Sequence, residues 1–204
     1  MVAVIDYGVG NLFSLSRSLE YIGINAVVTS DVNKIQNANH IILPGVGAFG
    51  DAAAQLRERG LDETVKEQAR AGKPLLGICL GMQMLCDVSY EYGVHKGLGL
   101  IPGEVADMKP CLPDTLKVPH IGWNSLKFEG EKSRLYKYIH EGDFVYFVHS
   151  FYAKANKKYI SATAEYGIPV TASIENECVF GVQFHPEKSG KVGLDILRAF
   201  CEIK

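Results

Sequence analysis

Residues 74–85, PLLGICLGMQML, decide the fold and carry the strongest candidate for chemistry. The apolar run 74–78 is typical of a buried strand, and the methionines and leucine within 82–85 indicate the helix that follows. Between them lies a cysteine flanked by glycines, 77–81, GICLG. A strand that turns sharply into a helix at Gly-x-nucleophile-x-Gly forms a nucleophile elbow. The segment therefore predicts that Cys79 is a nucleophile at the end of a buried strand.

The helix that follows gives this position its chemistry. A helix N-terminus favours the thiolate over the thiol and directs backbone N–H groups at a developing oxyanion. The flanking glycines allow the turn to close because they have no side chains. The competing interpretation of Cys79 is a buried structural thiol packed beside glycines, since free cysteine behaves as a small hydrophobic residue. The context of strand, turn and helix favours the nucleophile.

Short apolar runs alternate with helix-period segments on both sides of this stretch. Strands are expected before it at 2–5, 26–28 and 40–43. One helix is expected from Leu12 to Ile22, and another from a cap at Asp51 to the break at Ala71-Gly72. The second half is richer in strands, at 144–148, 160–164 and 178–182, and ends in a helix that begins near Lys191. This alternation predicts an α/β fold with a largely parallel sheet and helices on both faces.

Composition excludes several classes of protein. Hydrophobic residues make up 47% of the 204 positions and the formal charge is −2, which argues against a disordered chain and against electrostatic binding to nucleic acid or membranes. The first ten residues, MVAVIDYGVG, match neither a signal peptide nor a membrane span. Five cysteines without a Cys-x-x-Cys pair favour a reducing, cytoplasmic location, and no metal or cofactor is expected. No linker or repeat is present, so we expect one domain over residues 1–204.

A second candidate for chemistry is His185-Pro-Glu187, which follows the expected strand 178–182. Residues i and i+2 of an extended segment share a side, so the Glu187 carboxylate can orient the His185 imidazole. Together with Cys79 these residues have the types of a nucleophile–base–orienter triad. The alternative for this motif is a turn with a surface ion pair.

The segment 44–50, PGVGAFG, lies between a strand and a helix and contains Gly-x-Gly-x-x-Gly, so a dinucleotide-binding loop has to be considered. That motif requires an acidic residue about 20 positions further on, at the end of the next strand. Here the next strand ends in the nucleophile elbow. We favour a flexible glycine loop that offers N–H donors across a pocket from Cys79.

Three motifs together resemble the class I glutamine amidotransferases, which use a Cys-His-Glu triad: 44–47, 77–83 and 184–187. Three further segments, 6–11 (DYGVGN), 120–124 (HIGWN) and 146–150 (YFVHS), narrow the similarity to the glutaminase subunits of imidazole glycerol phosphate synthase, from histidine biosynthesis. The similarity extends from residue 5 to the C-terminus. It implies a three-layer flavodoxin-like fold with a mostly parallel central sheet, helices on both faces and extra antiparallel strands in the second half.

The resemblance also implies roles for single residues. Cys79 attacks the carboxamide of glutamine, His185 protonates the departing ammonia and then activates water, and Glu187 orients His185. Backbone N–H groups of the oxyanion hole come from Val46, Gly47 and Leu80. Contacts to glutamine are expected from Gly47, Gln83, Glu91, His149, Ser150 and Phe151.

The same resemblance implies a partner, a (β/α)8-barrel cyclase subunit that forms a heterodimer with this chain and consumes the ammonia. The candidate contacts around the ammonia exit are Asn11, Trp123, Asn124, Tyr146 and Lys188. Trp123 is expected in a Gly-Trp-Asn loop, and core packing is the alternative for its side chain.

Three alternatives remain open from the sequence. The same glutaminase chemistry could serve another synthase, such as one that forms amidino sugars. The chain could be a stand-alone cysteine hydrolase, in which the acid partner and the glutamine contacts would differ. A non-catalytic binding module is the third alternative, and the intact set of Cys79, His185 and Glu187 argues against it.

Overall fold

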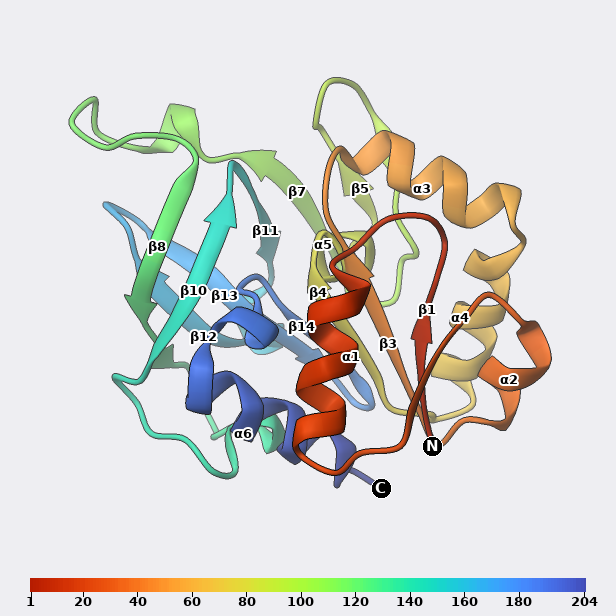
Figure 1. The fold of residues 1–204 in the computed structure, drawn as a ribbon. Coiled ribbons are helices and arrows are strands. Elements are labelled where there is room, and N and C mark those ends of the chain that lie inside the picture. The colour runs from red at the N-terminus through yellow and green to blue at the C-terminus, as the bar shows by residue number, and fades with distance from the viewer.

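One eight-stranded sheet runs through the computed structural model, which describes all 204 residues (Figure 1). Its strand order is β2-β1-β3-β4-β14-β13-β12-β9. The bounds are β1 Val2–Ile5, β2 Ala26–Thr29, β3 His40–Gly45, β4 Leu75–Cys79, β9 Lys127–Phe128, β12 Ile160–Glu165, β13 Pro169–Asn176 and β14 Val179–Val182. The strands from β2 to β14 are parallel, in the flavodoxin-like order, and the last three are antiparallel. The expected fold class is confirmed.

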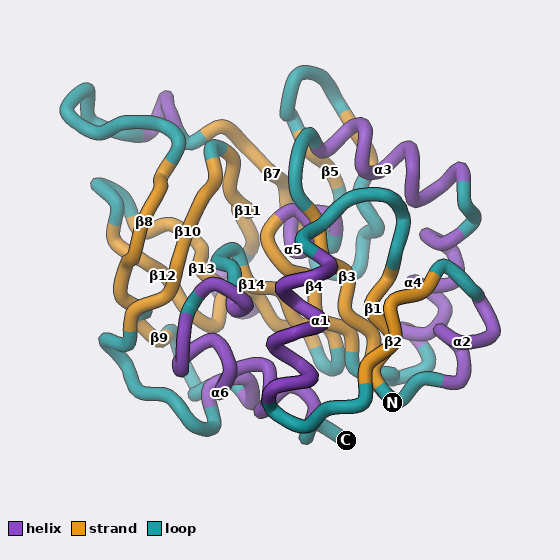
Figure 2. Tube along the Cα trace, viewed as in Figure 1, coloured by secondary structure: helices purple, strands orange, loops and turns teal.

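Helices cover both faces of this sheet, as Figure 2 shows. They are α1 Leu12–Tyr21, α2 Val32–Asn37, α3 Phe49–Glu58, α4 Leu61–Arg70, α5 Leu80–Met84 and α6 Gly190–Cys201. Within β1, Ala3 and Ile5 pack with the layer of α2, α3 and α4, whereas Val2 and Val4 pack with α1 and α6. A strand buried on both faces has to be apolar at every position, which explains the continuous run. None of the helices combines the length and the apolar character that crossing a membrane requires.

Two smaller sheets pack against opposite faces of the main sheet, one on the side of α3 and the other on the side of α1 and α6 (Figure 1). One has four strands, in the order β11-β7-β5-β6, and the other pairs β8 with β10. Their bounds are β5 Val88–Ser89, β6 His95–Lys96, β7 Gly103–Asp107, β8 His120–Ser125, β10 Phe144–His149 and β11 Phe151–Ala155. Single 3-10 turns are η1 Lys109–Cys111, η2 Arg134–Tyr136, η3 Lys157–Tyr159 and η4 Pro186–Lys188. All strand pairs of these two sheets are antiparallel except that of β5 with β7. The additions bring the segment 144–151, with 120–125 paired to it, beside the carboxyl ends of β4 and β14.

Three expectations from the sequence are wrong. The helix expected from Asp51 to Gly72 is two helices, because Gly60 between α3 and α4 has φ 66° and ends the first of them. Asp51 lies in the first turn of α3 and does not cap it; the N-cap residue is Ala48. The Gly-Trp-Asn segment is not a loop but part of β8, in which Trp123 pairs with Tyr146.

Glycines let α5 approach the sheet closely. A Cβ atom added to Gly81 would lie 1.8 Å from the carbonyl oxygen of Leu43 in β3. A Cβ atom on Gly77 would lie 2.6 Å from the carbonyl oxygen of Gly81, and one on Gly45 would lie 2.8 Å from the Gly81 nitrogen. All three positions therefore exclude any larger residue.

We predict that Gly81→Ala lowers the free energy of unfolding by about 3 kcal/mol, because the methyl group forces α5 away from β3. Gly23→Ala is the matched control. Gly23 has φ 78° but nothing within 4 Å of its Cβ position, so only backbone strain of about 1 kcal/mol is expected. Urea unfolding of both variants measures the difference. Equal losses for the two variants would contradict the close packing of α5.

Candidate active site

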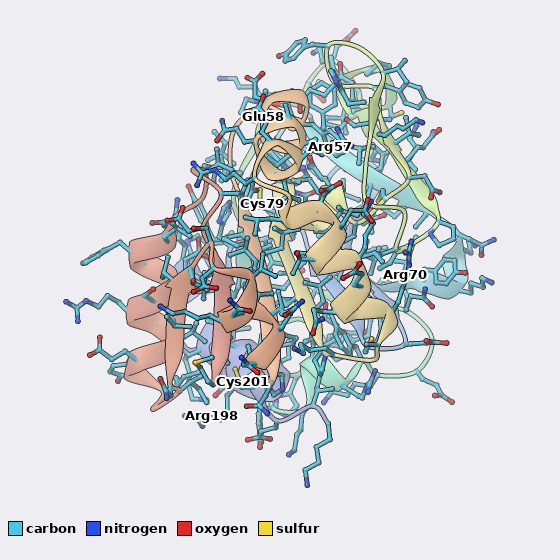
Figure 3. All side chains as sticks on the ribbon, turned by 90° about the vertical axis from the view of Figure 1, so that its right-hand side faces the viewer. Arg57, Glu58, Arg70, Cys79, Arg198 and Cys201 are labelled. Carbon is cyan, nitrogen blue, oxygen red and sulfur yellow. The ribbon has the colours of Figure 1, made fainter.

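Cys79 lies where β4 passes directly into α5. Its backbone has φ 55° and ψ −110°, a conformation that side chains rarely adopt, and only 7% of the residue is exposed. In Figure 3 it lies below α3, at the opposite end of the sheet from Cys201. The parallel strands end at this edge, where open α/β sheets bind their ligands. The elbow predicted from the glycines is present.

His185 and Glu187 lie beside this cysteine, at the end of β14. Nδ1 of His185 is 2.9 Å from Oε1 of Glu187, and both side chains are 3% exposed. Burial lowers the pKa of His185, but its hydrogen bonds with Cys79 and Glu187, together with their charges, outweigh this and raise the pKa to about 9. The net shift favours the imidazolium form of His185. The other carboxylate oxygen of Glu187, Oε2, is buried without a hydrogen-bond partner.

A cavity of about 270 Å³ opens over Cys79 and His185. It has the volume of a small ligand, below that of typical drug-sized sites. The residues expected in the oxyanion hole and around glutamine all line it: Val46, Gly47, Leu80, Gln83, Glu91, His149, Ser150 and Phe151. The sequence did not single out Tyr92, which also lines the cavity, with φ 51° and its ring edge-to-face on Phe151.

Glu91 connects this cavity to α3. Its Oε2 accepts a hydrogen bond of 2.6 Å from the backbone N–H of Phe49, the first residue of α3. The carboxylate thus caps the helix that Ala48 cannot cap with its own side chain. Burial raises the pKa of Glu91, and the hydrogen bond from Phe49 opposes this shift. A carboxylate at this position is suited to hold an ammonium group.

The glycine loop after β3 faces the elbow across the same cavity. Gly45 pairs with Cys79 in the parallel register of β3 and β4, and Gly47 has φ 93°. The hydroxyl of Tyr7, which is buried, donates a 2.8 Å hydrogen bond to the carbonyl of Pro44 and holds the start of the loop. Position 50 requires glycine for packing, since a Cβ atom there would lie 2.6 Å from the ring of His95.

Amide side chains connect the cavity wall to the nucleophile. Nε2 of Gln83 donates to the carbonyl of Phe151 at 3.0 Å and to Oε1 of Gln183 at 3.1 Å. Nε2 of Gln183 in turn lies 3.7 Å from Sγ of Cys79. Both N–H groups of Gln83 are used, so only its oxygen remains for a ligand. Gln183 was missed by the motif analysis, although it stands only two residues before His185, in the bend that follows β14.

His149 lines the cavity, and His120 lies directly behind it. Nδ1 of His149 lies 2.9 Å from the carbonyl of Phe151, and its Nε2 lies 3.1 Å from Nδ1 of His120. His120 stacks between the rings of Phe147 and Tyr166, with centroid distances of 4.8 and 4.1 Å. Burial lowers the pKa of His120 to about 4 and that of His149 to about 3. Both rings are therefore uncharged hydrogen-bonding groups.

Of the residues expected to contact a partner, the side chains of Trp123, Tyr146 and Lys188 lie together, whereas those of Asn11 and Asn124 lie apart from them. Trp123 is 54% exposed, which excludes core packing, and its ring centroid is 6.1 Å from that of Tyr146. Nζ of Lys188 lies 5.8 Å above the Tyr146 ring. Asn11 lines a small cavity together with His185 and Glu187. The Asn124 side chain is turned inward and donates to the carbonyl of Glu165 at 2.8 Å.

Comparison with known proteins identifies the family. The model of the family "Glutamine amidotransferase class-I" matches residues 3–203. A protein of Listeria monocytogenes named imidazole glycerol phosphate synthase subunit HisH is 47% identical over 100% of this chain and 96% of its own length. A protein of the same name from Caldanaerobacter subterraneus is 48% identical over 100% of this chain and 98% of its own.

Among solved structures, PurLQS from Thermotoga maritima superposes with a TM-score of 0.74 at 22% identity, covering 98% of this chain and 96% of the other. A structure described as a glutamine amidotransferase gives a TM-score of 0.76 at 18% identity, covering 99% of this chain and 98% of the other. At these identities the two structures support the fold alone. The sequence match over nearly the whole length makes this chain a member of the class I glutamine amidotransferase family.

Proposed function

We propose that this chain is the glutaminase subunit of an imidazole glycerol phosphate synthase, which hydrolyses L-glutamine to glutamate and ammonia. The observation that carries the proposal is that Cys79 and His185 line one cavity and that Glu187 holds His185 from behind. The relatives named imidazole glycerol phosphate synthase subunit HisH match the whole chain, which supports the choice of synthase. The family match over residues 3–203 also supports a single domain.

The first half-reaction is acyl transfer to Cys79. The thiolate attacks the carboxamide carbon of glutamine, and the negative charge that develops on oxygen is stabilised by the backbone N–H of Leu80 and by one from the loop at Val46 or Gly47. His185 gives its proton to the nitrogen as the C–N bond breaks, so ammonia leaves and a thioester remains. Glu187 holds the imidazole ring in place through Nδ1.

The charges around His185 explain how one ring serves both half-reactions. Its pKa is raised by contacts with Cys79 and Glu187. Once the sulfur is acylated, the contribution from Cys79 is lost, because the thioester carries no charge and its sulfur is a weak acceptor. The pKa of His185 then falls, and the neutral ring can take a proton from the water that attacks the thioester. Glutamate leaves and the thiolate is restored.

The ammonia requires an acceptor, and we propose that a (β/α)8-barrel cyclase subunit docks over the exposed face of β8 and β10. Trp123, Ile121 and Phe144 are 54%, 58% and 56% exposed on these strands. Large exposed apolar residues gathered on one face are typical of interaction sites. Tyr146 and Lys188 join this face to the active site, since the backbone N–H of His185 bonds the carbonyl of Tyr146 at 2.9 Å. Five free cysteines support a reducing, cytoplasmic location.

Cys79→Ala tests the nucleophile. Glutamine-dependent synthesis by the complex should fall by roughly 10³-fold or more, because no thioester can form. Synthesis from added ammonium salts should persist, since the partner subunit consumes the ammonia. The matched control is Cys86→Ala, which removes another buried thiol from the same region. A Cys79→Ala complex that still hydrolysed glutamine would refute the assignment.

Glu187→Gln tests the pKa of His185. The acid form of His185 is required to protonate ammonia, so kcat/KM of the complex should fall as pH rises through about 9. Removing the carboxylate charge lowers the pKa of His185 and should move this alkaline limb down by about one pH unit. The rate should fall less than in Cys79→Ala. An alkaline limb that stays in place would show that Glu187 does not raise this pKa.

Val46→Pro tests the loop donor of the oxyanion hole. Proline has no N–H, and loss of one such donor costs roughly 10²–10³ in kcat. The variant should still assemble with the partner, but the complex should lose glutaminase activity. Val46→Ala keeps the N–H and should remain active. Normal glutaminase activity of a Val46→Pro complex would exclude Val46 and leave Gly47 as the donor.

A further inference from the structure

Gln183 is a fully buried polar side chain in contact with the nucleophile, and the triad gives it no role. We propose, on the basis of the glutaminase function above, that Gln183 is a further catalytic residue, which donates an amide hydrogen bond to Sγ of Cys79 and stabilises its thiolate. The sulfur then has two donors, the imidazolium of His185 and the amide of Gln183.

The direction of the Gln183 amide follows from one backbone group. The carbonyl oxygen of Phe151 can only accept hydrogen bonds, so the atom of Gln83 that lies 3.0 Å from it is the NH₂ nitrogen. The same nitrogen lies 3.1 Å from one end of the Gln183 amide, which must therefore be the oxygen. The other end, 3.7 Å from Sγ, is the NH₂ nitrogen. Gln183 consequently offers a donor, not an acceptor, to the sulfur.

The backbone fixes where this donor lies. The N–H of Gln183 bonds the carbonyl of Ala172 in β13 at 2.8 Å, and the N–H of His185 bonds the carbonyl of Tyr146 in β10 at 2.9 Å. Residues 183 and 184 form a bend directly after β14, and these two backbone hydrogen bonds hold the bend at both ends. The amide of Gln183 and the ring of His185 both contact the sulfur of Cys79 from this short segment.

A second donor is useful because Nδ1 of His185 is occupied by Glu187, so the other ring N–H has to serve both the sulfur and the departing ammonia or the attacking water. His185 transfers its proton to ammonia in the first half-reaction and takes a proton from water in the second. When the tetrahedral intermediate of the second half-reaction collapses, the C–S bond breaks and its electron pair returns to sulfur as a thiolate. A buried anion without donors is costly, and hydrogen bonds to charged groups are roughly twice as strong as neutral ones. Gln183 remains in place as a neutral donor throughout.

Gln183→Met tests the proposal, because methionine has a similar length but no N–H. The readout is the pH dependence of Cys79 alkylation by iodoacetamide in the glutamine-free complex, followed on the peptide that contains Cys79. The other titratable groups around the sulfur are unchanged in the variant: His185, Glu187, Tyr7, Glu91 and His149. We expect the alkylation midpoint to rise and kcat for glutamine to fall roughly ten- to hundredfold, with KM changed less than threefold.

Ser161→Ala is the matched control, because it removes another buried hydrogen bond, the 2.7 Å contact between Ser161 and Ser173, away from the site. It should leave the alkylation midpoint unchanged. Gln83→Met frees the Gln183 amide to rotate and should raise the midpoint by a smaller amount. If Gln183→Met does not fold, the alkylation midpoint of Gln83→Met tests the proposal instead.

An unchanged midpoint in folded Gln183→Met, or in Gln83→Met where that variant decides, would overturn the proposal. Failure of the glutaminase function is a separate result, since it would appear as a wild-type complex that does not hydrolyse glutamine.

Discussion

The contact between Gly81 and the carbonyl of Leu43 is the constraint on which the rest of the site depends. It lets α5 start directly against β3, so the N-terminus of the helix lies beside the loop that continues from that strand. The loop residue Gly45 then pairs with Cys79, and the two expected sources of oxyanion donors face one cavity. Any side chain at position 81 would separate them. The oxyanion hole can therefore form only because residue 81 has no Cβ atom.

A single carbonyl orders the polar groups around the cavity. The oxygen of Phe151 accepts from Gln83 on one side and from His149 on the other. The first bond orients the two amides that lead to Cys79, and the second orients the histidine pair that leads to Asn124. His185 and its partners Glu187 and Cys79 thus lie beside a wall of neutral polar groups that are fixed in direction. Such preorganised dipoles need no rearrangement when charge develops on the substrate.

Local patterns in the sequence predicted the parallel core and the elbow, because β1 and β4 are buried on both faces and the glycines mark the turn. Features that depend on tertiary contacts were not predicted. Gly60 lies between two helical patterns of the same period, so only its φ of 66° reveals the break. The glycine and asparagine of segment 122–124 favour a turn, but pairing of β8 with β10 overrides them. Gln183 belongs to no catalytic motif, and only its distance from Sγ of Cys79 identifies it as a candidate.

The backbone strain at Cys79 has a consequence for protein engineering. A residue held at φ 55° and ψ −110° costs of order 1–3 kcal/mol, and glycine would avoid much of that cost. Selection for thermostability alone would therefore favour loss of the nucleophile, so a screen for thermal resistance has to retain an activity readout. Gains in stability are better sought far from this edge of the sheet, where no function opposes them. The strained cysteine is thus a compromise between the stability of the fold and catalytic activity.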